Sequence, residues 1–120
     1  MTSGIPDYIE DPVVLKSFVY DRFDKYTPPE LYEITKAMKP DFPPGTDWKY
    51  SNGNYNILGM IIEKITGNKI GEKKTKRIII PLGLADTIYP DTPYMEGQYS
   101  HGYRKDKKTG MITNVTEIDH

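Results

Sequence analysis

The segment that most constrains the fold is an apolar run between positions 52 and 66. Seven of its side chains are apolar and cover most of a helix circumference: Tyr55, Ile57, Leu58, Met60, Ile61, Ile62 and Ile65. A helix that is apolar nearly all round is expected to be buried on several sides. The chain has 120 residues and a mean hydropathy of −0.63, so it has little other material to cover such a helix. We therefore expect part of the packing partner to lie outside this chain.

Local signals predict the other elements. Thr27, Pro28 and Glu30 have the spacing of a capped helix start, and that helix should run to about Met38. Gly67 is a good terminator for the central helix. We also expect helices over 13–24 and 69–80, and a hairpin with strands at 99–104 and 111–115. The expected fold class is mainly α with a small β-hairpin, in one partial domain over residues 1–120.

Composition excludes several classes of function. With 16 Lys and Arg against 17 Asp and Glu, the net charge is −1, which argues against a nucleic-acid partner. The chain has no Cys and only two His, so disulfides and zinc sites are not expected. No signal peptide is predicted, and the longest aliphatic run, Ile78-Ile79-Ile80, is too short for a transmembrane segment.

A tyrosine and an asparagine form the most informative pair. A stiff loop containing Pro43-Pro44-Gly45 leads to Tyr50 and Asn52, just where the central helix should begin. In extended backbone, positions i and i+2 point the same way, so these two side chains should converge. A phenol, with an ordinary pKa of about 10, becomes a usable base where ammonium groups favour the phenolate. The spacing alone equally allows Ser51 or Asn52 to cap the helix while Tyr50 packs against Trp48.

An ordered set of windows resembles the serine β-lactamase-like hydrolases, especially class C β-lactamases and the D-alanyl-D-alanine carboxypeptidases among penicillin-binding proteins. Residues 2–8 resemble that family's His-Thr-Ser-Gly-Ile-Pro turn, with Met1 in place of the His. Tyr50-Ser51-Asn52 resembles its Tyr-x-Asn motif. The other similar windows are 42–46, 55–59, 63–67, 81–84, 86–87 and 101–103. The resemblance implies that the chain forms most of the helical lobe of this family's α+β fold.

The resemblance also implies a covalent mechanism with three motifs. A Ser-x-x-Lys pair supplies the nucleophile and its lysine, Tyr-x-Asn carries protons and orients an amide, and a late Lys-Thr-Gly or His-x-Gly strand aligns the substrate. Tyr50 and Asn52 are therefore the expected catalytic residues, and Ser51 is expected to cap the helix. None of the four serines has Lys three positions later. We expect an internal fragment that lacks the nucleophile and is inactive alone.

Other segments resemble parts of such a site, but we expect them to have structural roles. Lys108-Thr109-Gly110 has the spelling of the third motif, but it follows a charged run and is expected to be the hairpin tip. His101 is expected to be structural. Ser3-Gly4 lacks a His partner and a strand-to-helix setting, so we expect a turn. The basic run over 73–77 is expected to be a solvated face.

The sequence thus predicts a fragment of a serine-type D-alanyl-D-alanine carboxypeptidase. By resemblance, its substrate would be a peptidoglycan peptide or a β-lactam, its other partner the remainder of the parent chain, and its location the cell envelope or the extracellular space. No metal or organic cofactor is implied. The alternatives are a β-lactamase, esterase or D-aminopeptidase of the same family, or a non-catalytic helical module that binds peptidoglycan or a protein. An uncovered apolar face could also make the isolated piece self-associate.

Overall fold

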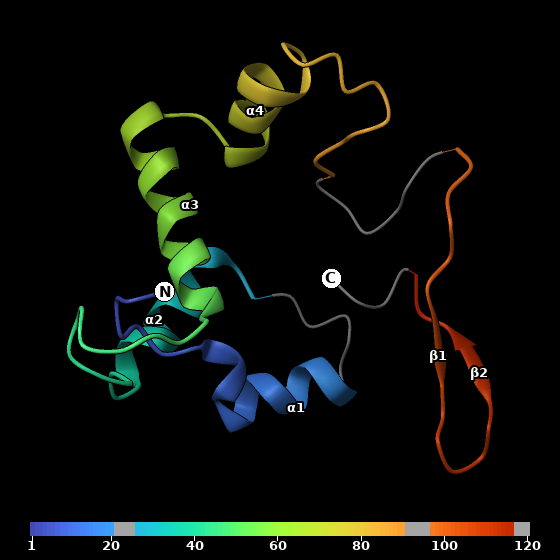
Figure 1. Cartoon of the computed structure of the whole chain (residues 1–120), viewed down its shortest axis with the longest axis horizontal. Helices are drawn as coiled ribbons and strands as arrows, with labels where there is room; N and C mark the ends of the chain where they lie inside the picture. Colours follow the sequence, from blue (N-terminus) through green and yellow to red (C-terminus); the bar gives the residue numbers. More distant parts are fainter. Residues whose placement is uncertain (21–25, 91–96, 117–120) are drawn as a thin grey trace. The chain divides into compact units, whose positions relative to one another are not determined.

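The structure, a computed structural model, describes residues 1–20, 26–90 and 97–116 and falls into two compact units, Met1–Lys73 and Lys74–His120 (Figure 1). The first unit is helical. Its elements are η1, a 3-10 turn (Tyr8–Glu10), and the helices α1 (Pro12–Tyr20), α2 (Pro28–Ala37), α3 (Asn52–Thr66) and α4 (Ile70–Lys74), the last ending at the boundary. The second unit contains a π-helical turn, η2 (Thr75–Ile79), and two strands, β1 (Tyr103–Lys105) and β2 (Ile112–Asn114). The expected class, mainly α with a small hairpin, is confirmed.

Local signals decide where the helices begin and end. The Glu30 carboxylate accepts hydrogen bonds from the Thr27 backbone N–H at 2.7 Å and from the Thr27 hydroxyl at 2.6 Å, so the predicted start of α2 is confirmed. Gly67 ends α3 with a left-handed φ of 64°. Asp11 caps α1 by accepting from the backbone N–H of Val13 at 2.9 Å. The predicted 13–24 helix is confirmed as far as Tyr20, and positions 21–25 lie outside the described residues.

Within the first unit, α3 packs against α2 and η1. Gly53 is the buried residue of α3, and a Cβ atom there would lie only 2.9 Å from the carbonyl oxygen of Pro6. Within this chain α3 is not buried on several sides, since Leu58 and Ile65 are 53% and 78% exposed, and the expectation of a packing partner outside the chain stays a prediction. The physical reason is that α2 and η1 reach only part of the helix circumference.

The predicted 69–80 helix is present, but its geometry changes along its length. After α4, the backbone widens into η2, where the N–H of Ile80 donates to the carbonyl of Thr75 at 3.0 Å, five residues back. Lys74, Lys76 and Arg77 are exposed, which confirms the solvated basic face.

The predicted hairpin is confirmed with shorter strands. β1 and β2 are antiparallel, and Arg104 pairs with Thr113 at the centre of the register. Lys108-Thr109-Gly110 lies in the connecting turn, as expected, where Asp106 Oδ1 accepts from the backbone N–H groups of Lys108 at 2.8 Å and Thr109 at 2.6 Å. In the part of the chain that is described, no helix has the length and apolar character needed to cross a bilayer.

Candidate active site

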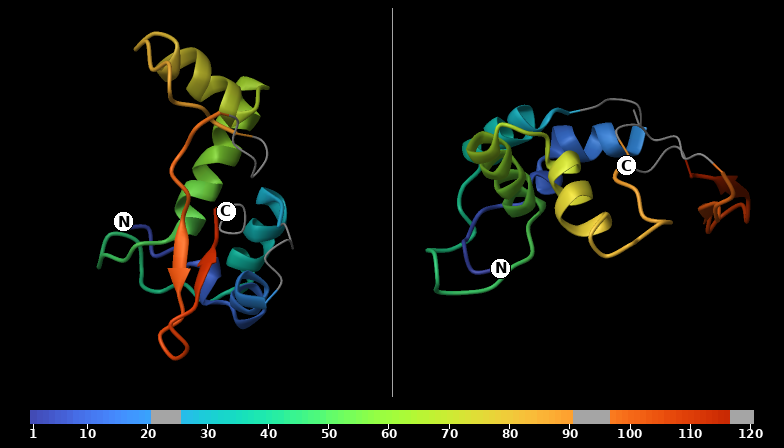
Figure 2. Two further views of the ribbon diagram at one scale, coloured as in Figure 1. Left: turned by 90° about the vertical axis from the view of Figure 1, so that its right-hand side faces the viewer. Right: turned by 90° about the horizontal axis from the view of Figure 1, so that it is seen from above.

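The N-terminal segment and the 41–49 loop lie side by side, and the loop leads to the start of α3 (Figure 2). Three backbone hydrogen bonds join them, each with a loop N–H as donor: Lys49 to Met1 at 3.1 Å, Gly45 to Thr2 at 2.7 Å and Asp41 to Gly4 at 3.0 Å. The Ser3 hydroxyl accepts from the N–H of Ile5 at 3.2 Å and donates to Asn54 Oδ1 at 2.7 Å, so Ser3-Gly4 forms the expected turn. The 41–49 loop that leads to Tyr50 is therefore fixed by residues 37 to 48 positions away.

Tyr50 and Asn52 converge as the extended spacing predicts. The Tyr50 hydroxyl donates to Asn52 Oδ1 at 3.1 Å, and the phenol is half exposed. Its aromatic neighbour is Tyr55, one turn into α3, with ring centroids 6.3 Å apart. The phenol oxygen therefore lies where a second molecule or another chain segment can reach it.

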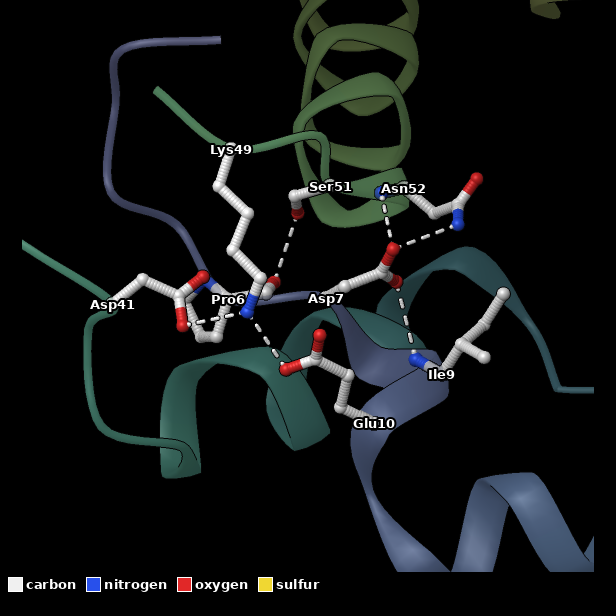
Figure 3. Close-up of polar contacts among 8 residues, drawn as sticks. All are labelled: Pro6, Asp7, Ile9, Glu10, Asp41, Lys49, Ser51 and Asn52. Carbon is white, nitrogen blue, oxygen red and sulfur yellow. Dashed lines mark hydrogen bonds and ion pairs between the residues drawn. The ribbon is translucent and has the colours of Figure 1, made fainter. Parts of the chain in front are cut away.

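Asp7 contacts Asn52, and the sequence analysis assigned no role in the site to this residue. Its side chain is only 7% exposed. Figure 3 shows it between η1 and the first turn of α3, where Oδ2 accepts from Asn52 Nδ2 at 2.9 Å and from the Asn52 backbone N–H at 3.2 Å. Its other oxygen accepts from the N–H of Ile9 at 3.2 Å. In the sequence, Pro6-Asp7 resembles any exposed turn, so only the long-range contact shows this role.

Ser51 occupies the N-cap position of α3 as expected, but its hydroxyl does not cap the helix. Its backbone is extended, with φ −152° and ψ 126°. The fully buried hydroxyl instead donates to the carbonyl of Pro6 at 3.0 Å (Figure 3). The first N–H of the helix is satisfied by Asp7. Because the Ser51 hydroxyl is buried and bound, it is not placed to act as a nucleophile.

Lys49, next to Tyr50 in sequence, is bound to two carboxylates. Its ammonium lies 2.9 Å from Glu10 and 3.0 Å from Asp41, and these hydrogen bonds raise the pKa of Lys49 above its ordinary value (Figure 3). The positive charge is therefore balanced within this cluster. A lysine that stabilises a Tyr50 phenolate would have to come from elsewhere.

Tyr8 is a second phenol near the pair. Partial burial raises the pKa of Tyr8 above its ordinary value, and the negative charges of Asp7 and of an ionised Tyr50 raise it further. Tyr8 therefore stays protonated well beyond neutral pH and is not a base. Tyr8 is thus partly buried, whereas Tyr50 is half exposed.

His101 lies in the second unit, where its Nδ1 is 3.2 Å from the Thr116 hydroxyl, consistent with the expected structural role. Among the described residues, no three His, Asp or Glu side chains are grouped to hold a metal ion. The site that remains is the Tyr50–Asn52 pair with Asp7 behind it. Such a pair can pass a proton and orient an amide, but a covalent route needs a nucleophile that these residues do not provide.

Known proteins resemble the chain along nearly its full length. The family model described as Beta-lactamase matches residues 1–116. The solved structure of a D-stereospecific amidohydrolase from Streptomyces sp. is 38% identical with a TM-score of 0.87, over 98% of this chain and 36% of that one. The D-aminopeptidase of Brucella anthropi is 30% identical over 118 residues, which are 97% of this chain and 22% of that protein.

A penicillin binding protein from Bacillus halodurans has the same fold, with a TM-score of 0.75 at 20% identity, over 97% of this chain and 35% of that one. The solved neighbours confirm that the chain has the fold of β-lactamases and penicillin-binding peptidases. The chain spans about a fifth of the length of the curated relatives it matches.

Proposed function

The chain belongs to the beta-lactamase family, and from this premise we propose that it supplies the Tyr-x-Asn part of the active site of a serine hydrolase that cleaves amide bonds next to D-amino acids. Tyr50 and Asn52 are the proposed catalytic residues. The nucleophilic serine and its lysine would come from another part of the complete protein. The amide would be cleaved through an acyl-enzyme, which water then hydrolyses.

The observation that carries this proposal is the hydrogen bond from the half-exposed Tyr50 hydroxyl to Asn52 Oδ1, 3.1 Å long, at the start of α3. In the proposed reaction, Tyr50 relays a proton: as its oxygen takes the proton of the attacking serine hydroxyl, its own hydroxyl proton passes to the leaving amine nitrogen. Asn52 Oδ1 has a second lone pair that can accept an N–H of the substrate or of the lysine.

The preference for D-amino acid amides is supported by two relatives whose names describe such activities, the D-stereospecific amidohydrolase and the D-aminopeptidase. A D-alanyl-D-alanine carboxypeptidase is the second candidate, supported by the fold shared with a penicillin binding protein. Because its substrate would be peptidoglycan, the complete protein would act in the cell envelope or outside the cell. Both candidates share a bond flanked by a D-residue, and they differ in the leaving group.

The proposal is tested in the complete protein with matched D- and L-alanine amides and with a peptide ending in D-alanyl-D-alanine. We expect hydrolysis of the D-amide and not of the L-amide. Tyr50→Phe should lower kcat about a hundredfold with little change in KM, because proton transfer is lost while binding stays. The 120-residue chain alone serves as the blank, since it contains no Ser-x-x-Lys motif.

Tyr55→Phe is the matched control, because it removes a hydroxyl from the neighbouring ring without touching Asn52. This variant should keep full activity. Faster cleavage of the D-alanyl-D-alanine peptide than of the amide would favour the carboxypeptidase. Full activity of Tyr50→Phe would show that Tyr50 does not take part in the reaction.

A further inference from the structure

We propose that Asp7 is a positioning residue, which fixes the Asn52 amide so that its oxygen faces the Tyr50 hydroxyl. The inference rests on the proposed function of that pair, but it adds a residue that lies outside the Tyr-x-Asn motif. Asp7 is 45 positions away from Asn52 in the sequence and is joined to it by two hydrogen bonds (Figure 3).

The argument begins with what a carboxylate can do. An ionised carboxylate only accepts hydrogen bonds, whereas an asparagine side chain donates from one end and accepts at the other. Because Asp7 Oδ2 lies 2.9 Å from the Asn52 amide, the amide must turn its NH2 group toward Asp7. The reversed amide would place two acceptor oxygens against each other in a site that is only 7% exposed at Asp7.

The orientation of Asn52 also determines where the Tyr50 hydroxyl hydrogen points. With its NH2 group held by Asp7, Asn52 presents Oδ1 to Tyr50, which donates to it at 3.1 Å. The hydrogen of the phenol therefore points at Asn52, and the lone pairs of the Tyr50 oxygen point elsewhere. An attacking hydroxyl can then donate to these lone pairs, and Tyr50 takes its proton only as the phenol's own proton leaves Asn52 for the amine nitrogen, as in the proposed relay.

Asp7 itself is held in place. It forms the N-cap of η1 through the N–H of Ile9 at 3.2 Å, and the preceding Pro6 carbonyl accepts from the buried Ser51 hydroxyl at 3.0 Å. A carboxylate fixed from two directions cannot follow a rotating amide. The orientation of Asn52 is therefore set by the N-terminal segment.

The test is Asp7→Asn in the complete protein. The substituted amide keeps the size of Asp7, but it can offer an acceptor to only one of its two neighbours, Ile9 and Asn52. We expect Asn52 to lose its fixed orientation and kcat to fall roughly ten- to a hundredfold, by analogy with residues that orient metal ligands in metalloenzymes. KM should change little. Asp11→Asn is the matched control. The hydrogen bonds of the Asp11 carboxylate come from the N–H groups of Val13 and Val14, at the start of α1, and not from Tyr50 or Asn52.

Nuclear magnetic resonance supplies a readout independent of activity. In the unmodified protein, the Asn52 NH2 protons should exchange slowly with water, because they are bound to a buried carboxylate; in Asp7→Asn they should exchange faster, and in Asp11→Asn they should not change. Fast exchange in the unmodified protein would overturn the proposal, even if Asp7→Asn fails to fold. Unchanged kcat in a folded Asp7→Asn variant would do the same.

The two proposals fail separately. If Tyr50→Phe keeps full activity, the proposed function fails, while the exchange measurement still decides whether Asp7 orients Asn52. If Tyr50→Phe loses activity but Asp7→Asn keeps it, only the role of Asp7 is lost.

Discussion

At the scale of single residues, Gly4 decides how closely the N-terminal segment approaches the 41–49 loop. Its φ is +71°, and a Cβ atom built on it would overlap the carbonyl oxygen of Phe42. Its own carbonyl accepts from the N–H of Asp41 at 3.0 Å. Gly4 is thus required by both conformation and space, and Asp7 lies three positions further along the same segment.

We predict that Gly4→Ala destabilises the chain by at least about 2 kcal/mol, since it adds a steric overlap to an unfavourable φ. Urea denaturation measures this as a fall in the free energy of unfolding. Gly45→Ala is the matched control, because Gly45 also has a positive φ, +84°, but open space around it. It should cost only about 1 kcal/mol. Equal losses in the two variants would mean that the overlap with Phe42 contributes nothing.

Whether a contact in the site could be predicted depends on how far apart its two residues lie in the sequence. The convergence of Tyr50 and Asn52 depends on the extended backbone of Ser51 between them, so the two-residue spacing predicts it. The Ser51 hydroxyl and the Asp7 carboxylate instead find partners 45 positions away, Pro6 and Asn52. No local pattern specifies such pairs, and for that reason Ser51 has the expected N-cap position but not the expected side-chain hydrogen bond.

At the scale of the elements, local signals are sufficient. The capping box at Thr27 and the left-handed Gly67 gave α2 and α3 the predicted ends, because each signal acts within one turn. The widened turn η2 was not predicted, since the apolar pattern over 69–80 is equally compatible with an ordinary α-helical turn.

The capping box of α2 also predicts a pH dependence. Hydrogen bonds from the side chain and then the backbone of Thr27 lower the pKa of Glu30 below its ordinary value. Its stabilisation is fully present above the unfolded pKa, about 4.3, and is lost as the pH falls through the lower folded pKa. As the pH falls through the folded pKa of Glu30, we expect hydrogen exchange in the first turn of α2 to accelerate relative to the intrinsic rate. Glu30→Gln should abolish this acid response.

Glu33→Gln is the control for this prediction. Glu33 lies in the same helix and pairs with Lys36 at 3.3 Å on the surface, but it holds no N-terminal backbone group. This variant should keep the acid response of the first turn. The same response in Glu30→Gln would contradict a role for the capping box.

At the scale of the whole molecule, the class of fold was predictable and the burial was not. Four apolar residues of α3 at positions i, i+3, i+4 and i+7 form an exposed apolar stripe: Leu58, Ile61, Ile62 and Ile65. The sequence pattern shows that these side chains favour burial. It cannot show which partner buries them, because α2 and η1 cover other parts of the helix.

We predict that the exposed apolar stripe makes the isolated chain self-associate. Burial of one Leu or Ile side chain contributes about 1.5–3 kcal/mol, so Leu58→Lys with Ile65→Lys should weaken association at least tenfold. Lysine has a helix propensity close to that of leucine, so α3 itself should be kept.

Sedimentation velocity over a concentration series should show association of the unmodified chain and its loss in the double variant. Leu82→Lys with Ile88→Lys, two exposed positions of the second unit, should leave association unchanged. A chain that stays monomeric throughout the series would show that exposure of this stripe does not drive association.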